Sequence, residues 1–297
     1  MLVFIVDIKK EMKAYLDCYP CFFIQVLKTT RLVTSDEKKI WEILNKVSLS
    51  IPRIPLGVTP PEISREVYRI ISEETGIKDP YRKIKDECTH HALSLYPKLK
   101  KLIDSSKDRL EMAVRVAVAG NVIDFGAHAD FDLGADLEKI LSQEFVINHY
   151  PEFREALEKA RRILYLADNA GETVFDRLLI EEMQKPVIYV VREKPIINDA
   201  TREDALLSGI DEVAEIMSSG CDAPGNILKF CSEEFLKAFR SADLIISKGQ
   251  GNYEVLSEEN RPLFFFLKAK CPVIARDIGI EEGSIILMKS KKGQQAS

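Results

Sequence analysis

Residues 163–172, with the sequence ILYLADNAGE, decide the fold class of this chain. The run 163–167 is apolar and includes aromatic and branched side chains, which is typical of a strand buried on both faces. It ends in Asp168, Asn169, a glycine and Glu172, and apolar residues then recur at helical spacing over 175–183. A strand, a polar turn and a helix therefore follow one another. Ligands of open α/β sheets bind beyond the carboxyl ends of the strands, so we expect a site at this turn.

The C-terminal half repeats the same alternation. Its early apolar runs are separated by segments of helical length, which predicts βαβ units, a largely parallel sheet and a Rossmann-like three-layer α/β/α domain. The predicted strands are 163–167, 187–191, 213–217, 244–247, 263–267, 272–275 and 284–288.

The N-terminal part carries helix signals instead. Capping boxes at 34–37 and 59–62 open two predicted helices, and two more are expected at 79–99 and 108–120. We therefore expect an N-terminal helical bundle, or cap domain, over residues 1–150, and an α/β domain over 151–297 that carries the site. Residues 1–10 are either an additional strand or an irregular start of the chain.

Composition limits the classes of function. The chain has 297 residues and a formal net charge of −5, which gives it no general affinity for nucleic acid. No apolar run approaches the roughly 20 residues that span a membrane. Six cysteines in a chain of this length do not resemble a disulfide framework. We expect a cytoplasmic protein that acts on small molecules, in an oligomeric state that the sequence does not reveal.

Three polar loops are predicted to meet at one edge of the sheet. Asp199 lies 31 residues after Asp168, about one βαβ unit further on, and Lys248–Asn252 follows the strand predicted at 244–247. Right-handed crossovers bring these strand ends to the same edge. The acids and amides offer the oxygen ligands that Mg²⁺ or Mn²⁺ prefers. Lys248 and the N–H groups of the turn at Gly249 and Gly251 suit an anion, most naturally a phosphate.

Each signal also has a plainer interpretation. An acid at a strand end often caps the next helix, and Asn198 with Asp199 is well placed to do so. A glycine-flanked lysine after a strand is common in loops of any function. The joint occurrence of the three loops at one predicted edge favours a functional site.

Five motifs together resemble the damage-control phosphatase family, first catalogued as domain of unknown function 89. The resemblance covers nearly the whole chain and implies metal-dependent hydrolysis of small phosphorylated metabolites. It matches Asp168, Asn169 and Asp199 to metal ligands. The motifs are residues 119–124 (AGNVID), 168–172 (DNAGE), 198–199 (ND), 220–225 (GCDAPG) and 248–254 (KGQGNYE).

The resemblance also implies a set of substrate contacts. Lys248 and Asn252 match positions of the family's substrate loop, and Lys268 matches a second lysine that contacts phosphate. The Cys18-x-x-Cys21 pair marks the mostly prokaryotic subgroup of the family.

The order of residues after Asp168 bears on the mechanism. Ala170 stands where an Asp-x-Asp phosphatase has its second acid, so a phosphoaspartyl intermediate is not supported. We expect a bound Mn²⁺, Mg²⁺, Co²⁺ or Ni²⁺ ion to polarise the phosphoryl group and orient a water, while Lys248 offsets charge on the phosphoryl oxygens. Glu172 is either a general base or an acid favoured by the helix dipole.

Two further groups of residues have open roles. Asn121 and Asp124 either close the pocket from the helical part or form a helix-end turn. Cys18 and Cys21 could bind zinc together with Cys88 and His90 or His91, act in redox chemistry, or fill apolar space.

Two other functions compete with the phosphatase hypothesis. A strand followed by Asp-x-x-Gly resembles the nucleoside-binding turn of a methyltransferase, although such a turn normally carries more glycine. A metal- or phosphate-binding protein without turnover would show the same motifs. The identity of the substrate depends on pocket shape, which the motifs do not specify.

Overall fold

A seven-stranded sheet forms the centre of the computed structural model, which describes residues 12–55, 57–122 and 141–290. The strand order is β1-β7-β6-β5-β2-β3-β4. Neighbouring strands run parallel except β6 and β7, which pair antiparallel. The predicted α/β class with a largely parallel sheet is confirmed. The strands are β1 (Ile147–Asn148), β2 (Ile163–Leu166), β3 (Val187–Val191), β4 (Glu215–Ser218), β5 (Leu244–Lys248), β6 (Leu263–Lys268) and β7 (Ile285–Lys289).

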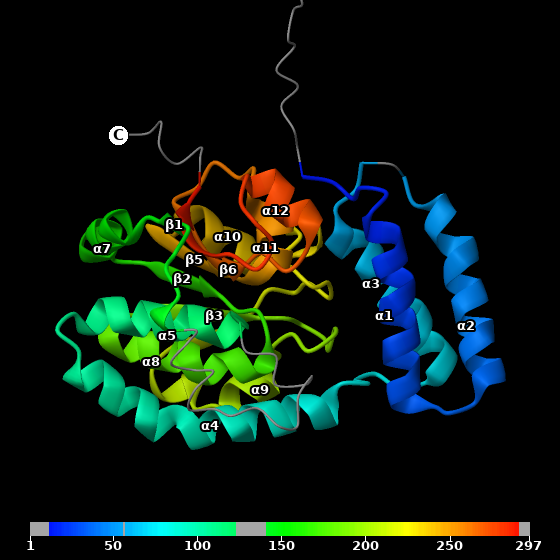
Figure 1. Ribbon diagram of the computed structural model, residues 1–297, viewed down its shortest axis with the longest axis horizontal. Coiled ribbons are helices and arrows are strands. Elements are labelled where there is room, and N and C mark those ends of the chain that lie inside the picture. Colours follow the sequence, from blue (N-terminus) through cyan, green and yellow to red (C-terminus); the bar gives the residue numbers. More distant parts are fainter. Residues whose placement is uncertain (1–11, 56, 123–140, 291–297) are drawn as a thin grey trace, which may run out of the picture.

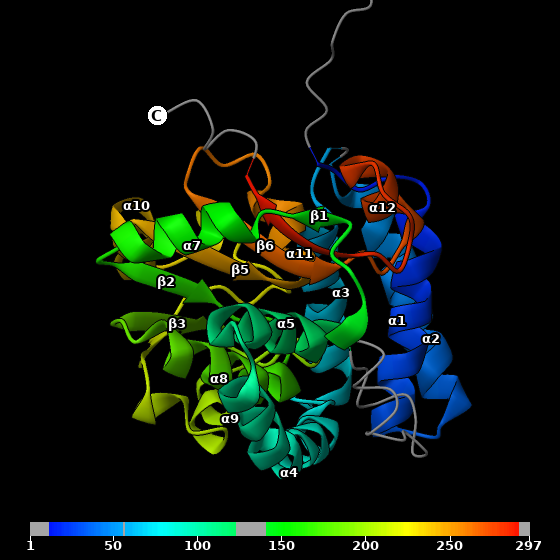
Figure 2. The ribbon, with the colours of Figure 1, turned by 60° about the vertical axis from the view of Figure 1, so that its left-hand side comes forward.

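Helices cover both faces of the sheet, which explains why its central strands read as continuous apolar runs. In β2, Ile163 and Tyr165 point into one apolar cluster while Leu164 and Leu166 point into the other. Figures 1 and 2 show α4, α5, α8 and α9 on one face and α10, α11 and α12 on the other. The helix α7 belongs to the first of these faces, because its Phe153 packs against Phe264 and Phe266 in the apolar cluster that α5 and α8 share. The bounds of these helices are α4 (Arg82–Ser105), α5 (Arg109–Val122), α7 (Tyr150–Lys159), α8 (Thr173–Met183), α9 (Arg202–Leu207), α10 (Glu233–Ser241), α11 (Gly249–Leu256) and α12 (Pro272–Ile278).

Three N-terminal helices form a separate group, α1 (Cys18–Val33), α2 (Glu37–Ser50) and α3 (Pro60–Thr75). The predicted capping box at 59–62 is present, since Thr59 and Glu62 form it at the start of α3. The box predicted at 34–37 is not formed, because Asp36 is the N-cap of α2 and accepts the N–H groups of Lys38 and Lys39. The group has its own apolar cluster, to which Ile196 of the loop after β3 also belongs. Figure 1 shows the three helices beside the sheet. They therefore face the loops at the carboxyl ends of the strands.

The helices predicted at 79–99 and 108–120 exist as α4 and α5, but they pack differently from the first three. Their apolar residues belong to the same cluster as one face of the sheet. They are part of the α/β layer, because their apolar sides are buried in the cluster that also contains residues of α7, α8 and the strands. We therefore propose that the division of the chain lies near residue 80, in place of the boundary expected at residue 150.

One predicted strand is wrong. The run 272–275 is the start of α12, whose N-cap is Cys271 and whose first residue is Pro272. A proline at the first helical position and Gly279 at the end favour a short helix over a strand, and an apolar run of four residues does not distinguish the two. The two-residue strand β1 was not predicted.

Short 3₁₀ helices complete the fold at Ile51–Arg53, Ala170–Glu172, Ile210–Glu212 and Leu228–Phe230. Among the described residues, no helix is both long and apolar enough to cross a membrane.

Candidate active site

The predicted site lies where the strand order reverses. The chain leaves β2 toward β3 and β4 on one side, while β5 and β6 lie on the other, so a crevice opens beyond the carboxyl ends of β2 and β5. Asp168 follows β2 and Gly249 follows β5. Gly249 has φ of +76°, and a Cβ atom there would stand 2.0 Å from Asp168 Oδ2. Glycine is therefore required both by the backbone conformation and by the carboxylate beside it.

Backbone hydrogen bonds lock the Asp168 and Asp199 turns together. The N–H of Ala170 donates to Asn198 O at 2.8 Å, and the N–H of Ala200 donates to Asp168 O at 2.8 Å. Asn169 and Asp199 form an antiparallel bridge. The sequence prediction that these two loops meet at one edge agrees with this arrangement.

Two amide side chains join the carboxylates of the site. Asn121 Nδ2, at the end of α5, lies 2.9 Å from Asp168 Oδ2 and 2.6 Å from Glu172 Oε1. Asn169 Nδ2 bonds the same two oxygens at 3.0 and 2.5 Å. Among the described residues no donor reaches Asn169 Oδ1, which leaves that oxygen available to a ligand. Asp124, predicted beside Asn121, lies outside the described residues.

Lys248 differs from its predicted role. Its ammonium is fully buried and has three protein acceptors: Ala117 O at 2.9 Å, Glu172 Oε2 at 3.0 Å and Asp176 Oδ1 at 2.6 Å. Burial alone would lower the pKa of Lys248, but Asp176 and Glu172 outweigh burial and raise it. Because three protein acceptors already surround the ammonium, it has no exposed N–H to offer a phosphate. Lys248 instead holds Glu172 and Asp176 in place beneath the site.

Asp176 is a buried member of this network that the sequence reasoning missed. Its carboxylate accepts hydrogen bonds from Tyr165 Oη at 2.6 Å and Tyr189 Oη at 2.8 Å, in addition to Lys248. The available signal was an acid on the apolar face of α8, four residues after Glu172. A buried acid on such a face needs partners.

Arg192 is a second missed residue, placed just after β3. Its Nε donates to Asp199 Oδ2 at 2.8 Å and its Nη2 to Asn252 Oδ1 at 3.2 Å. Asn252 is fully buried, and its Nδ2 bonds Ala167 O and Lys248 O. Asn252 therefore braces the strand ends, although it was expected at the substrate. An arginine directly after a buried strand was the available signal.

Of the remaining predicted substrate contacts, Gly251 is packed against another loop, whereas Lys268 lies at the edge of the site. A Cβ atom on Gly251 would stand 2.3 Å from Pro224 O, so this glycine serves the packing of two loops. Lys268 is half-buried and its backbone N–H donates to Asn121 Oδ1 at 3.2 Å. Lys270 is exposed, and its charge is close enough to lower the pKa of Asp168 and of Glu172. These two lysines lie at the edge of the site.

The site holds more buried negative charge than positive charge. Asp168, Glu172, Asp176 and Asp199 are buried together with Lys248 and Arg192, so full ionisation would leave 2 − 4 = −2. Burial, followed by the charges of Glu172 and Asp199, raises the pKa of Asp168 to about 8.

The other acids respond according to their partners. Burial also raises the pKa of Asp199, although Arg192 opposes the change. Burial pushes the pKa of Glu172 upward, but Lys248 outweighs it and the pKa falls below its ordinary value.

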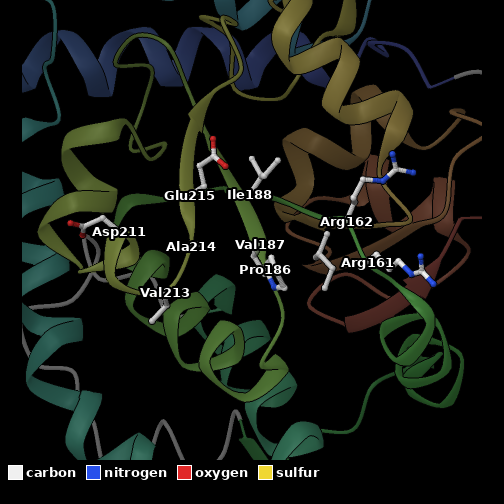
Figure 3. Close-up of a pocket in the computed structure, with 10 residues that line it drawn as sticks. Arg161, Arg162, Pro186, Val187, Ile188, Asp211, Val213, Ala214 and Glu215 are labelled. Carbon is white, nitrogen blue, oxygen red and sulfur yellow. The ribbon is translucent and has the colours of Figure 1, made fainter.

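A cavity of about 470 Å³ lies at the other end of the strands. Figure 3 shows Arg161, Arg162, Val187 and Glu215 among its lining residues, at the amino ends of β2, β3 and β4. It is therefore separated from Asp168 by the length of the strands and is not part of the candidate site.

The cysteine pair does not meet the partners considered for a zinc site. Cys88, His90 and His91 lie on α4, whereas Cys18 and Cys21 lie on α1. Burial is the largest cause that raises the pKa values of Cys18 and Cys21, and the charges of Cys271 and Glu254 add to it. Within the described part of the chain, no group of three or more His, Cys, Asp or Glu side chains is arranged to hold a metal ion. The divalent-ion site expected at Asp168, Asn169 and Asp199 is not a group of this kind, because the amide of Asn169 supplies one of its three ligands.

Comparison with known proteins identifies the family. A profile described as "Damage-control phosphatase ARMT1-like domain" matches residues 14–286. The chain belongs to this family.

Relatives and a solved structure agree over nearly the full chain. "Damage-control phosphatase PH1575" of Pyrococcus horikoshii is 35% identical over 295 residues, covering 94% of this chain and 99% of the relative. A protein named "Damage-control phosphatase" from Archaeoglobus fulgidus is 34% identical over 280 residues, covering 91% and 96%. The crystal structure of a DUF89 family protein from Pyrococcus horikoshii superimposes with a TM-score of 0.87 at 33% identity and covers 95% of this chain and 100% of that one.

Membership in the damage-control phosphatase family confirms the resemblance drawn from the motifs. It supports a phosphatase that acts on damaged metabolites, and relatives named phosphatases imply small phosphorylated substrates.

Proposed function

We propose that this damage-control phosphatase requires a divalent cation and hydrolyses small phosphorylated metabolites such as sugar phosphates. The observation that carries the proposal is the excess of four buried carboxylates over two buried cations, which would leave a charge of −2 if all six groups were ionised. An uncompensated charge of this size is expensive to bury, and a divalent cation would neutralise it. The proton that the raised pKa of Asp168 implies would be displaced when the cation binds.

Asp168, Asn169 and Asp199 are the residues that fit such an ion. Asp168 lacks a lysine or arginine within ion-pair distance among the described residues, and the free Oδ1 of Asn169 lies in the same turn. The two turns are joined by the backbone bonds of Ala170 and Ala200. Carboxylate and amide oxygens favour Mg²⁺ and Mn²⁺, and Co²⁺ or Ni²⁺ can bind by higher intrinsic affinity.

The surrounding residues position these ligands. When bound, the ion would polarise the phosphoryl group and lower the pKa of a water. Glu172 accepts a hydrogen bond from the Asn169 amide, Asn121 donates to Asp168 and to Glu172, and Lys248 donates to Glu172. Both oxygens of Glu172 already accept hydrogen bonds, which favours a positioning role over general base catalysis. Lys268 and Lys270 are the cations at the edge of the site that suit the phosphate oxygens.

The decisive experiment measures phosphate release and metal binding together. Purified protein is treated with EDTA, dialysed, and assayed with p-nitrophenyl phosphate and a panel of sugar phosphates, with and without Mg²⁺, Mn²⁺, Co²⁺ or Ni²⁺. We expect no release after chelation, recovery with the cation, and one tight site by calorimetry. Equal hydrolysis in excess EDTA would overturn the proposal.

A further inference from the structure

A second cavity of about 470 Å³ lies between α3 and the loop that follows β3. Its helical wall is one face of α3, because Arg65, Tyr68, Arg69 and Ser72 recur three and four residues apart. The opposite wall is the loop segment 194–197. The volume lies within the usual range for pockets that bind small molecules.

This cavity adjoins the proposed metal site. Its wall residue Ile197 is followed directly by Asn198 and Asp199. Ile197 has φ of +46°, a left-handed conformation that is strained for a β-branched residue and is found mainly where function requires it. Burial raises the pKa of Tyr68, and the charges of Tyr81 and Asp199 contribute to the increase, so this ring lies near the metal-site acid.

The acidic groups that line the cavity already have partners. Asp222 is bonded by Arg65, and Asp79 receives Lys85 Nζ at 3.2 Å. Glu73 bonds Arg69 Nη1 at 2.5 Å. Each of the three acids among the described lining residues therefore has a cationic partner, although Lys85 is not itself a lining residue and also bonds Asp204 at 2.8 Å.

Two lysines of the cavity have no such partner. Among the described residues, no acid lies within 4.0 Å of the ammonium of Lys78 or of Lys194. Both side chains are exposed and line the cavity from opposite sides, one after α3 and one after β3. Tyr68, Ile196 and Ile197 add apolar surface to the same cavity. An organic molecule with an anionic end would complement this combination of surfaces.

We propose that this cavity binds a second anionic group of the substrate, a carboxylate or a further phosphate, while the scissile phosphate lies at Asp168 and Asp199. This inference rests on the proposed phosphatase function and narrows its substrate class. Ile197 and Asp199 are two residues apart, so their backbones are separated by at most about 7 Å. We therefore expect the substrate to be a metabolite that carries anionic groups at both ends of a chain of a few carbons.

The test compares substrates that differ only in the second anion. Glucose 6-phosphate carries one anionic group, 6-phosphogluconate adds a carboxylate, and glucose 1,6-bisphosphate adds a phosphate. We expect kcat/KM for 6-phosphogluconate, for glucose 1,6-bisphosphate, or for both to exceed that for glucose 6-phosphate by about five- to tenfold. An increase of this size is reasonable for contacts with two exposed lysines. The double variant Lys78→Ala/Lys194→Ala should remove this preference through KM.

Matched variants separate charge from structure. Lys78→Arg/Lys194→Arg should retain the preference, and Lys237→Ala, at an exposed lysine of α10, should behave as wild type. Hydrolysis of p-nitrophenyl phosphate should stay within twofold in every variant. Equal kcat/KM for the three sugar compounds in the wild type, or a uniform loss in the double variant, would overturn the inference while leaving the phosphatase intact.

A binding measurement distinguishes failure of the cavity from failure of the phosphatase. The three sugar compounds are titrated calorimetrically into EDTA-treated protein, in which no turnover is expected. Tighter binding of a compound with a second anion, abolished in the double alanine variant, supports the cavity whatever the activity. If none of the cations restores p-nitrophenyl phosphate hydrolysis, that result would count against the proposed phosphatase function and not against the cavity.

Discussion

The two ends of the central strands treat charge in opposite ways. At the amino ends, Arg162 pairs with Asp243 at 3.1 Å while 63% of the arginine side chain stays exposed. At the carboxyl ends, Lys248 pairs with Glu172 and Asp176, and none of the three side chains is more than 1% exposed. An exposed pair costs little and contributes little, whereas buried charges are costly unless their partners are complete. The strands are the same, so the difference supports the proposal that the chemistry takes place at their carboxyl ends.

Loss of an acid of the proposed metal site should have the largest effect. Asp168→Asn and Asp199→Asn are expected to lower kcat/KM by roughly a thousandfold or more, because they remove the cation and its stabilisation of the transition state. Calorimetry should show weaker metal binding while circular dichroism stays unchanged. Asp211→Asn, at the exposed amino-end cavity, is the matched control and should retain full activity. Wild-type activity in Asp168→Asn would show that the buried charge serves only the fold.

Removal of the buried lysine should have the next largest effect, and on stability. Lys248→Met leaves Glu172 and Asp176 without their cation, which should lower the free energy of unfolding by about 3–5 kcal/mol. Arg162→Ala at the amino ends should cost less than about 1 kcal/mol. Urea denaturation followed by circular dichroism measures both. Equal urea midpoints for Lys248→Met and Arg162→Ala would show that the buried and the exposed ion pairs contribute equally to stability.

The smallest expected effect concerns pH. Burial raises the pKa of Glu254 in α11 to about 7, although the hydrogen bond from Gln250 opposes the change. The folded protein therefore retains a proton that the unfolded chain loses above its ordinary pKa of 4.5. Stability falls as pH rises from about 4.5 to 7, and the loss is complete above 7.

Glu254→Gln should remove this decline, which amounts to about 2 kcal/mol between pH 5 and pH 8. The measurement is the free energy of unfolding at several pH values in EDTA. Glu215→Gln, at an exposed acid of the amino-end cavity, should keep the wild-type slope. A slope that does not change in Glu254→Gln would mean that Glu254 is ionised in the folded protein.

The sequence by itself determined most of the order of elements and the edge of the sheet at which the Asp168 and Asp199 turns meet. Apolar periodicity and capping boxes were sufficient because they act over a few neighbouring residues. The run 272–275 was misread as a strand because four apolar residues fit either structure until Pro272 is recognised as a helix start. The proximity of Asp168, Asn169 and Asp199 was predictable because parallel strands place their carboxyl ends together.

Only the tertiary structure decided which way the charged side chains point. Lys248 was expected at the phosphate, and the structure instead places its ammonium between Glu172 and Asp176. Sequence position fixes where a backbone turn lies, but the long side chain of a lysine can reach either a ligand or a buried acid. Asp176 and Arg192 come from different elements, and packing alone brings them to the same buried network. The balance of buried charge, on which the proposed metal site rests, is therefore a property of the fold and not of any one motif.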